Sequence, residues 1–132
     1  MVFLDANPVI YFVEQTPTWG PKAKARIMAL LAAGEQLAVT DIVRMECLVG
    51  PLKPGDLQIE SDFRTFFTSH DVRVLPIVAA VCERAARIRT THGFKPLDSL
   101  HLAAAVEHGC TLFLTNDKRS SSFPDIPVEV LS

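Results

Sequence analysis

Four carboxylates occupy positions in this chain where acidic side chains are unexpected: Asp5, Glu46, Asp98 and Asp117. Asp5 and Asp117 directly follow the segments V-F-L and L-F-L-T-N, whereas Glu46 and Asp98 lie in stretches rich in Ile, Val, Leu and Ala. Like charges that gather in a small domain repel one another and lose hydration, so they need a cation between them. Carboxylate oxygens are the ligands that hard ions such as Mg²⁺ and Mn²⁺ prefer. If the four acids meet in space, we therefore expect a divalent-metal site.

Three of these acids also have a simple structural explanation when each is taken alone. Asp5 can be an ordinary turn residue, and so can Asp117 in the sequence T-N-D. Asp98 comes two residues after a proline, where a carboxylate stabilises the first turn of a helix through the helix dipole. Thr115, which lies two residues before Asp117, can donate a hydrogen bond to a neighbouring carboxylate.

Glu46 gives the sharpest local signal. On a helix, Ile42 and Val49 lie within about 60° of it, which puts the carboxylate in an apolar stripe. A carboxylate in that position must be paired, hydrogen-bonded or metal-bound. A buried salt bridge to an arginine is the alternative to a metal. Asp41 points about 140° away from Glu46, and we expect it to start the helix and to lie outside the site.

The remaining polar residues give weaker signals. The four histidines share no zinc-binding spacing, and His101, three residues after Asp98, is expected to have a structural role. Basic residues precede Asp98 and follow Asp117. They either form a solvated face or contact the phosphates of a nucleic-acid strand, and the candidates are Arg84, Arg87, Arg89, Lys95, Lys118 and Arg119.

Short apolar runs alternate with amphipathic stretches along the chain. Strands are predicted at residues 2–4, 36–39, 72–75, 111–114 and 128–131, and helices at 8–14, 22–33, 41–49, 56–69, 77–91 and 97–108. Asn7 is predicted to cap the first helix, with Pro8 at its first position, and Gly34 and Gly109 are predicted to stop later helices. Residues 50–55, G-P-L-K-P-G, are predicted to break the chain between two helices.

This alternation predicts an α/β fold. The strands are continuously apolar, which is typical of a parallel sheet covered by helices on both faces. In such folds ligands bind beyond the carboxyl ends of the strands. Because Asp5 and Asp117 each follow a strand, we expect both at the same rim of the sheet.

Composition limits the class of protein. With 132 residues and 48% hydrophobic content, the chain is expected to form one globular domain over residues 1–132. A net charge of -2 argues against nucleic-acid binding through overall positive charge. Cys47, Cys82 and Cys110 are odd in number and lack C-x-x-C spacing, so we expect buried free thiols. No leader segment and no apolar run of about 18 residues is present, so a cytoplasmic protein without a membrane span is expected.

The chain resembles the PIN-domain family, and specifically the VapC-type toxin ribonucleases of toxin–antitoxin pairs. The resemblance is carried by V-F-L-D-A-N-P-V-I, T-D-I-V-R-M-E, P-L-D-S-L-H-L-A-A-A and L-F-L-T-N-D, in this order along essentially the whole chain. It implies a PIN-like domain with about five parallel strands in the order 3-2-1-4-5. By position, the four acids match the catalytic and metal-binding quartet of the family, and the residues that match its supporting positions are Asn7, Thr115 and Asn116. Ala6 stands where many relatives carry Ser or Thr, and whether Asn116 or Asp117 reaches the metal is left open.

The resemblance also implies an activity and partners. The activity is that of an endoribonuclease that uses one or two Mg²⁺ or Mn²⁺ ions and a metal-activated water to cleave RNA. The partners are an RNA substrate, a cognate antitoxin and a second copy of the chain in a homodimer. A candidate contact surface for these partners comprises Trp19, Phe63, Phe66 and Phe67.

Other classes of protein compete with this interpretation. The main alternative is a catalytically silent PIN-like module that binds RNA or a protein. A phosphoryl-transfer receiver domain is disfavoured, because it needs paired acids after the first strand and a lysine after the last. A haloacid-type phosphatase needs D-x-D after the first strand, where this chain has D-A-N.

Overall fold

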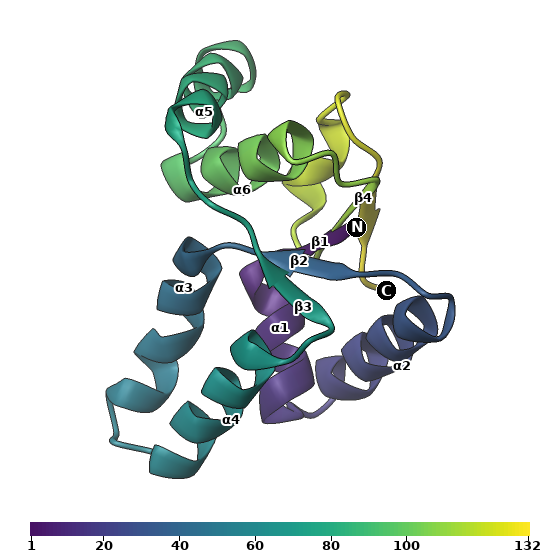
Figure 1. Ribbon diagram of the computed structural model, residues 1–132, viewed down its shortest axis with the longest axis vertical. Helices are drawn as coiled ribbons and strands as arrows, with labels where there is room; N and C mark the ends of the chain where they lie inside the picture. The colour runs from purple at the N-terminus through teal and green to yellow at the C-terminus, as the bar shows by residue number, and fades with distance from the viewer.

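The computed structural model describes residues 1–132 and contains a five-stranded parallel sheet between two layers of helices (Figure 1). The strand order is β3-β2-β1-β4-β5, and every neighbouring pair is parallel, which confirms the predicted fold class and strand order. The strands are β1 (Val2–Leu4), β2 (Leu37–Val39), β3 (Val72–Val74), β4 (Leu112–Thr115) and β5 (Val128–Val130).

Six α-helices flank the sheet. They are α1 (Ala6–Glu14), α2 (Trp19–Ala32), α3 (Asp41–Leu52), α4 (Leu57–Thr68), α5 (Ala79–His92) and α6 (Pro96–Glu107), and a short 3₁₀ helix, η1 (Lys118–Ser122), follows β4. Figure 1 shows α5 and α6 above the sheet and α1, α2, α3 and α4 below it. No helix is long and apolar enough to cross a membrane.

The core lies on both sides of the central strand β1. All three residues of β1 are buried, and the ring of Phe3 stacks on that of Phe113 in β4, with centroids 5.3 Å apart. On α6, Ala103, Ala104 and Ala105 are fully buried, and their small side chains allow the helix to pack closely on the sheet. This packing fixes α6, and with it the position of Asp98, relative to β1 and β4.

The first helix begins earlier than predicted. Asp5, and not Asn7, is the N-cap of α1: its Oδ1 accepts a hydrogen bond from the Ala6 amide at 2.9 Å. The prediction of an Asn7 cap was therefore wrong, because the chain turns into the helix directly at the acid that ends β1. Asn7 lies in the first turn and is exposed.

Two other helix boundaries differ from the prediction. Helix α2 begins at Trp19 in place of 22, because Pro21 is compatible with a first turn, where its missing N–H costs nothing. Helix α3 continues through Gly50 and Pro51 to Leu52, past the predicted break. Pro51 is buried there, so packing outweighs its local preference to end a helix.

Two predictions about burial were wrong. Phe63, Phe66 and Phe67 are all buried on the inner face of α4, so they belong to the core and not to a contact surface. Cys82 is exposed on α5, whereas Cys47 and Cys110 are buried as predicted; all three are free thiols. Cys82 is exposed because the buried residues of α5 are Val81, Ala85 and Ile88, and a position directly after Val81 points to a different face.

Candidate functional site

The four predicted acids line one pocket of about 420 Å³, which we call the acidic pocket. Its lining residues come from four segments that are distant in sequence: Asp5, Ala6, Asn7, Glu46, Lys95, Pro96, Leu97, Asp98, Asp117 and Arg119. The sequence left open whether the four acids meet in space, and in the structure all four line one pocket.

The parallel topology explains this convergence. Strands β1 and β4 are neighbours, and the Asp5 amide donates to the Leu114 carbonyl at 2.9 Å, so the ends of both strands lie at the same rim. Helix α3 leaves the same rim after β2 and carries Glu46 in its second turn. Helix α6 runs back toward the start of β4, so its first turn, with Asp98, also lies at this rim.

Asp5 is held in place by two donors. Its Oδ1 accepts from the Ala6 amide at 2.9 Å, and its Oδ2 accepts from the Thr115 hydroxyl at 2.7 Å. Thr115 is itself buried, and its Oγ1 accepts from the Asp117 amide at 3.0 Å. The expected hydrogen bond from Thr115 to a neighbouring carboxylate is therefore present. Each Asp5 oxygen keeps a lone pair that a cation can use.

Glu46 contacts a buried histidine. His101 is 1% exposed, and its Nε2 lies 2.6 Å from Glu46 Oε1 and 3.9 Å from Asp5 Oδ1. Nε2 carries the hydrogen in this contact, because a carboxylate can only accept. The other ring nitrogen, Nδ1, is buried and has no partner. His101 therefore orients the Glu46 carboxylate, a role that sequence analysis missed; its place three residues after Asp98 in a buried Ala-rich segment was the available signal.

The surroundings of Glu46 differ from the prediction. Val49 is exposed and Ile42 is only half-buried, so the apolar residues around Glu46 do not form a buried face. The buried face of α3 is formed by Val43, Cys47 and Pro51. Glu46 lies beside that face, at the boundary between core and pocket, and is held there by His101.

Asp98 is the acid of the pocket whose carboxyl has a raised pKa. Burial raises the pKa of its carboxyl above the ordinary value, and the charges of Asp5 and Asp117 raise the pKa further, although Arg119 opposes this. These neighbours show that the acids are close enough to repel one another. Leu102 and Ala105, further along α6, are buried.

Asp117 points into the pocket and is paired with Arg119. The Arg119 guanidinium donates from Nη2 to Asp117 Oδ2 at 2.8 Å and from Nε to Oδ1 at 3.1 Å. These hydrogen bonds lower the pKa of the Asp117 carboxyl. Asn116 turns away from the pocket and donates to the Tyr11 hydroxyl at 2.9 Å, so Asp117 is the one of the two that reaches the pocket.

The six basic residues that were predicted as possible contacts to nucleic-acid phosphates lie in different places in the structure. Only Lys95 and Arg119 line the acidic pocket. Arg84 is paired with Glu107 at 2.6 Å, and Arg89 donates from Nε to the Phe94 carbonyl at 3.1 Å. The two others, Arg87 and Lys118, are exposed outside the pocket.

The donor set of the pocket fits a hard divalent cation, because it consists of carboxylate oxygens whose mutual repulsion such an ion would relieve. In the present side-chain positions no three acidic, histidine or cysteine side chains are arranged to hold one ion. His101 and Arg119 each hold one of the four carboxylates in its present position.

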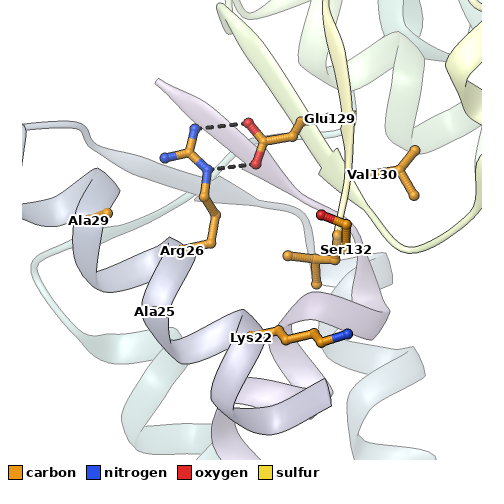
Figure 2. Close-up of a pocket in the computed structure, with 8 residues that line it drawn as sticks. Lys22, Ala25, Arg26, Ala29, Glu129, Val130 and Ser132 are labelled. Carbon is orange, nitrogen blue, oxygen red and sulfur yellow. Dashed lines mark hydrogen bonds and ion pairs between the residues drawn. The ribbon is translucent and has the colours of Figure 1, made fainter. Parts of the chain in front are cut away.

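A second pocket, of about 500 Å³, lies between α2 and the C-terminal strand (Figure 2). Lys22 lines it, and two further charged residues, Arg26 and Glu129, face each other across two hydrogen bonds of 2.6 and 2.9 Å. The pair neutralises itself and joins α2 to β5. The remaining lining is largely apolar and brings no further acids together.

The chain belongs to the PIN domain family, whose profile matches residues 2–127. A comparison with curated proteins gave no significant match. Among solved structures, the chain is similar to VapBC2 from Rickettsia felis bound to a promoter DNA fragment, with a TM-score of 0.82, 19% identity and coverage of 100% of both chains. It is also similar to a toxin–antitoxin complex from Klebsiella pneumoniae, with a TM-score of 0.73, 25% identity and coverage of 96% of this chain and 95% of the other. A third similar structure is VapC20 of Mycobacterium tuberculosis, described as a sarcin–ricin loop cleaving toxin, with a TM-score of 0.74, 16% identity and coverage of 96% and 99%.

Proposed function

We propose that this protein is a metal-dependent endoribonuclease and the toxin of a toxin–antitoxin pair. The observation that carries the proposal is the convergence of four carboxylates in one pocket of a PIN-domain chain. The similar solved structures support it, since they include toxin–antitoxin complexes and a toxin that cleaves the sarcin–ricin loop.

In this proposal Asp5 and Asp98 are the main ligands of one or two Mg²⁺ or Mn²⁺ ions, and Glu46 and Asp117 bind directly or through water. When bound, such an ion would lower the pKa of a water molecule and neutralise charge on the phosphate that is attacked. The protein contributes fixed positions for the ligands. Thr115 holds Asp5 and His101 holds Glu46, so both carboxylates are oriented before the metal arrives.

The positive side chains at the rim of the pocket complement the acids. Lys95 and Arg119 line the same pocket, so an RNA phosphate that approaches the acidic centre meets two cations at its edge. If Asp117 bound a metal ion, Arg119 would lose this carboxylate as its partner. We propose that it then binds substrate phosphate.

The most direct test in cells is to sequence RNA ends after brief induction of the protein, comparing the wild type with Asp98→Asn. New RNA ends at defined sites are expected with the wild type and not with the variant. If the two produce the same pattern of ends, the proposed nuclease site is wrong, and a catalytically silent module becomes the better interpretation.

We also propose an antitoxin partner and a homodimer. The three phenylalanines of the predicted aromatic surface are buried and Trp19 is half-buried, but another apolar surface is available on α3 and at the start of α4, where the exposed residues are Met45, Val49, Leu52 and Leu57. Exposed apolar surface of this kind is typical of protein contacts. Co-expression with the product of the neighbouring gene, followed by light scattering of the purified material, would show whether a hetero-complex or a dimer forms. We place this activity in the cytoplasm, where its RNA substrates would be.

A further inference from the structure

A small cleft of about 150 Å³ opens beside the acidic pocket. We call it the flanking cleft. It shares the four residues Lys95, Asp98, Asp117 and Arg119 with the acidic pocket, so the two hollows are continuous. Its other walls are Gly93 and Phe94, from the connection between α5 and α6, and Ser120 of η1. With one water taking up about 30 Å³ in the liquid, the cleft has room for roughly five, which is more than a single ion requires.

The geometry points to a binding site in the flanking cleft for a nucleotide next to the cleaved phosphate, with its base stacked on Phe94. This inference rests on the proposed function, because it assigns the neighbouring segment of the same single-stranded RNA. Aromatic rings bind successive bases of single strands through stacking, which every base permits.

Phe94 is held rigidly enough to serve as such a platform. Its carbonyl accepts from Arg89 Nε at 3.1 Å and from Ser99 Oγ at 3.5 Å, which ties the connection to both helices. Its ring stacks on His92 with centroids 5.4 Å apart and an interplanar angle of 13°, and Phe123 meets the ring edge-on. Phe94 is half-buried and lines the cleft. Little side-chain freedom would therefore be lost when a base binds.

The charges around the ring favour a nucleic-acid strand over an apolar peptide. Lys95 is exposed and makes no salt bridge, whereas Arg119 is paired with Asp117, so Lys95 is the free cation that lines both hollows. His92, on which the Phe94 ring stacks, also lines a groove of about 340 Å³ whose charged residues are Arg84, Arg87 and Asp125. The aromatic ring thus lies between the acidic pocket and a groove that carries two arginines and one aspartate. A positively charged groove with aromatic side chains is the usual design for binding single strands.

The test compares Phe94→Leu, which keeps apolar bulk but removes the flat ring, with Phe94→Tyr, which keeps the ring. Binding of a fluorescent single-stranded RNA is measured by anisotropy with Mg²⁺ present, in proteins that all carry Asp5→Asn so that the RNA stays intact. We expect Phe94→Leu to bind about tenfold more weakly, the loss of roughly one base–aromatic stack, and Phe94→Tyr to bind within about twofold of the parent. Phe12→Leu is the matched control, because Phe12 is also a half-buried ring but packs on Phe66 away from the cleft.

A second measurement uses proteins with Asp5 intact. Phe94→Leu is expected to raise the KM for RNA cleavage about tenfold and to leave kcat within about twofold, because Phe94 binds RNA but does not touch the reacting atoms. A general folding defect would instead lower the active fraction and thus the apparent kcat.

The outcomes separate this inference from the proposed function. If the wild type cleaves RNA but Phe94→Leu binds and cleaves like the wild type, the flanking cleft is not a base site. The proposed nuclease activity would still be supported. The flanking cleft is likewise not a base site if Phe94→Leu binds RNA normally but loses binding to a protein partner. If the protein binds RNA through Phe94 but cleaves no RNA with any divalent metal, the base site in the flanking cleft is supported and the proposed nuclease activity is contradicted.

Discussion

At the scale of single residues, the carboxylates of the acidic pocket differ in whether a neighbouring side chain compensates their charge. Glu46 has His101 and Asp117 has Arg119, whereas the Asp98 carboxylate has no hydrogen-bond partner. Asp98 therefore experiences burial and the repulsion of Asp5 and Asp117 with little compensation, and its pKa is raised. Charged residues that gather in a functional site often destabilise the fold, and Asp98 is the clearest case in the acidic pocket.

Replacing Asp98 by Asn should stabilise the metal-free protein. The substitution keeps the shape of the side chain but removes the repelled charge, so we expect Tm in EDTA to rise by roughly 2–5 °C, which corresponds to about 1 kcal/mol in a domain of this size. The gain should be larger at pH 8 than at pH 4.5. The raised pKa means that the native carboxyl holds its proton to higher pH than the unfolded one, so the wild type loses stability as pH rises through this range.

Differential scanning calorimetry with EDTA and with Mn²⁺ would check this prediction. Asp41→Asn is the control, because Asp41 is exposed at the start of α3 and lies outside the pocket. A lower Tm for Asp98→Asn in EDTA would contradict the prediction, as would equal stabilisation of this variant and the wild type by Mn²⁺.

His101 should act by positioning Glu46. In His101→Phe the ring volume is retained but the donor to Glu46 is lost, so we expect kcat for RNA cleavage to fall about 10- to 100-fold, as is typical when a partner of a metal ligand is removed. KM should change little, because His101 is buried and cannot touch RNA. His70→Phe, a change of an exposed histidine, should leave both constants unaltered; a similar loss of kcat there would argue against a specific role for His101.

The four acids and the Thr115 donor could be predicted from the sequence, but the partner of Glu46 could not. Asp5 and Asp117 follow strands, and the ends of neighbouring parallel strands must meet, so their convergence follows from topology. The pairing of Glu46 with His101 depends on how α3 and α6 pack against each other, which local spacing does not specify. The apolar residues beside Glu46 were identified, and so was its need for a partner, but the exposure of Val49 was not.

At the scale of elements, the start of each helix at the carboxyl rim determines where an acid lies. Thr40 caps α3: it is buried, and its Oγ1 accepts from the Val43 amide at 3.4 Å. Asp5 caps α1 while also lining the pocket, so one side chain both starts a helix and belongs to the site. The alternation of strands and helices was predictable from the hydrophobic pattern. The start of α1 and the end of α3 were not, since a cap by Asp5 and the burial of Pro51 depend on tertiary contacts.

Removing the cap of α3 should lower stability. We expect Thr40→Ala to lower the free energy of unfolding by about 1 kcal/mol, because the Val43 amide loses its acceptor in a buried place. Thr40→Ser keeps the hydroxyl and should cost less than half as much. Urea unfolding followed by circular dichroism would measure both. Equal losses for the two variants would mean that the methyl group, and not the cap, stabilises this end of α3.

At the scale of the whole molecule, the distribution of buried and exposed groups separates core from contact surface. The aromatic residues of α4 fill the core, and four of the six exposed large apolar residues lie on α3 and at the start of α4, where Leu57 is 76% exposed. Neither assignment follows from composition, because a Phe-rich helix can bury or expose that face. The packing of α4 against α3, α1 and β3 decides it.

The same distribution predicts the reactivity of the three thiols. Cys82 is exposed, whereas burial raises the pKa of Cys110 to about 11. Burial, followed by the charge of Glu46, raises the pKa of Cys47 to about 12. We expect iodoacetamide at pH 8 to label one thiol per folded chain and three per unfolded chain, as counted by mass spectrometry, and Cys82→Ser to remove the rapid label. Rapid labelling of two thiols in the folded wild type would contradict the structure.

The central claim is that the acidic pocket cleaves RNA only with a divalent cation, and one cleavage assay tests it most directly. Purified protein is incubated with RNA in Mn²⁺, in excess EDTA, and in EDTA followed by excess Mn²⁺, with Asp5→Asn as the matched variant. We predict cleavage in Mn²⁺, its loss in EDTA, its return when Mn²⁺ is restored, and no cleavage by Asp5→Asn under any condition. Equal cleavage in EDTA, or full activity of Asp5→Asn, would contradict the claim.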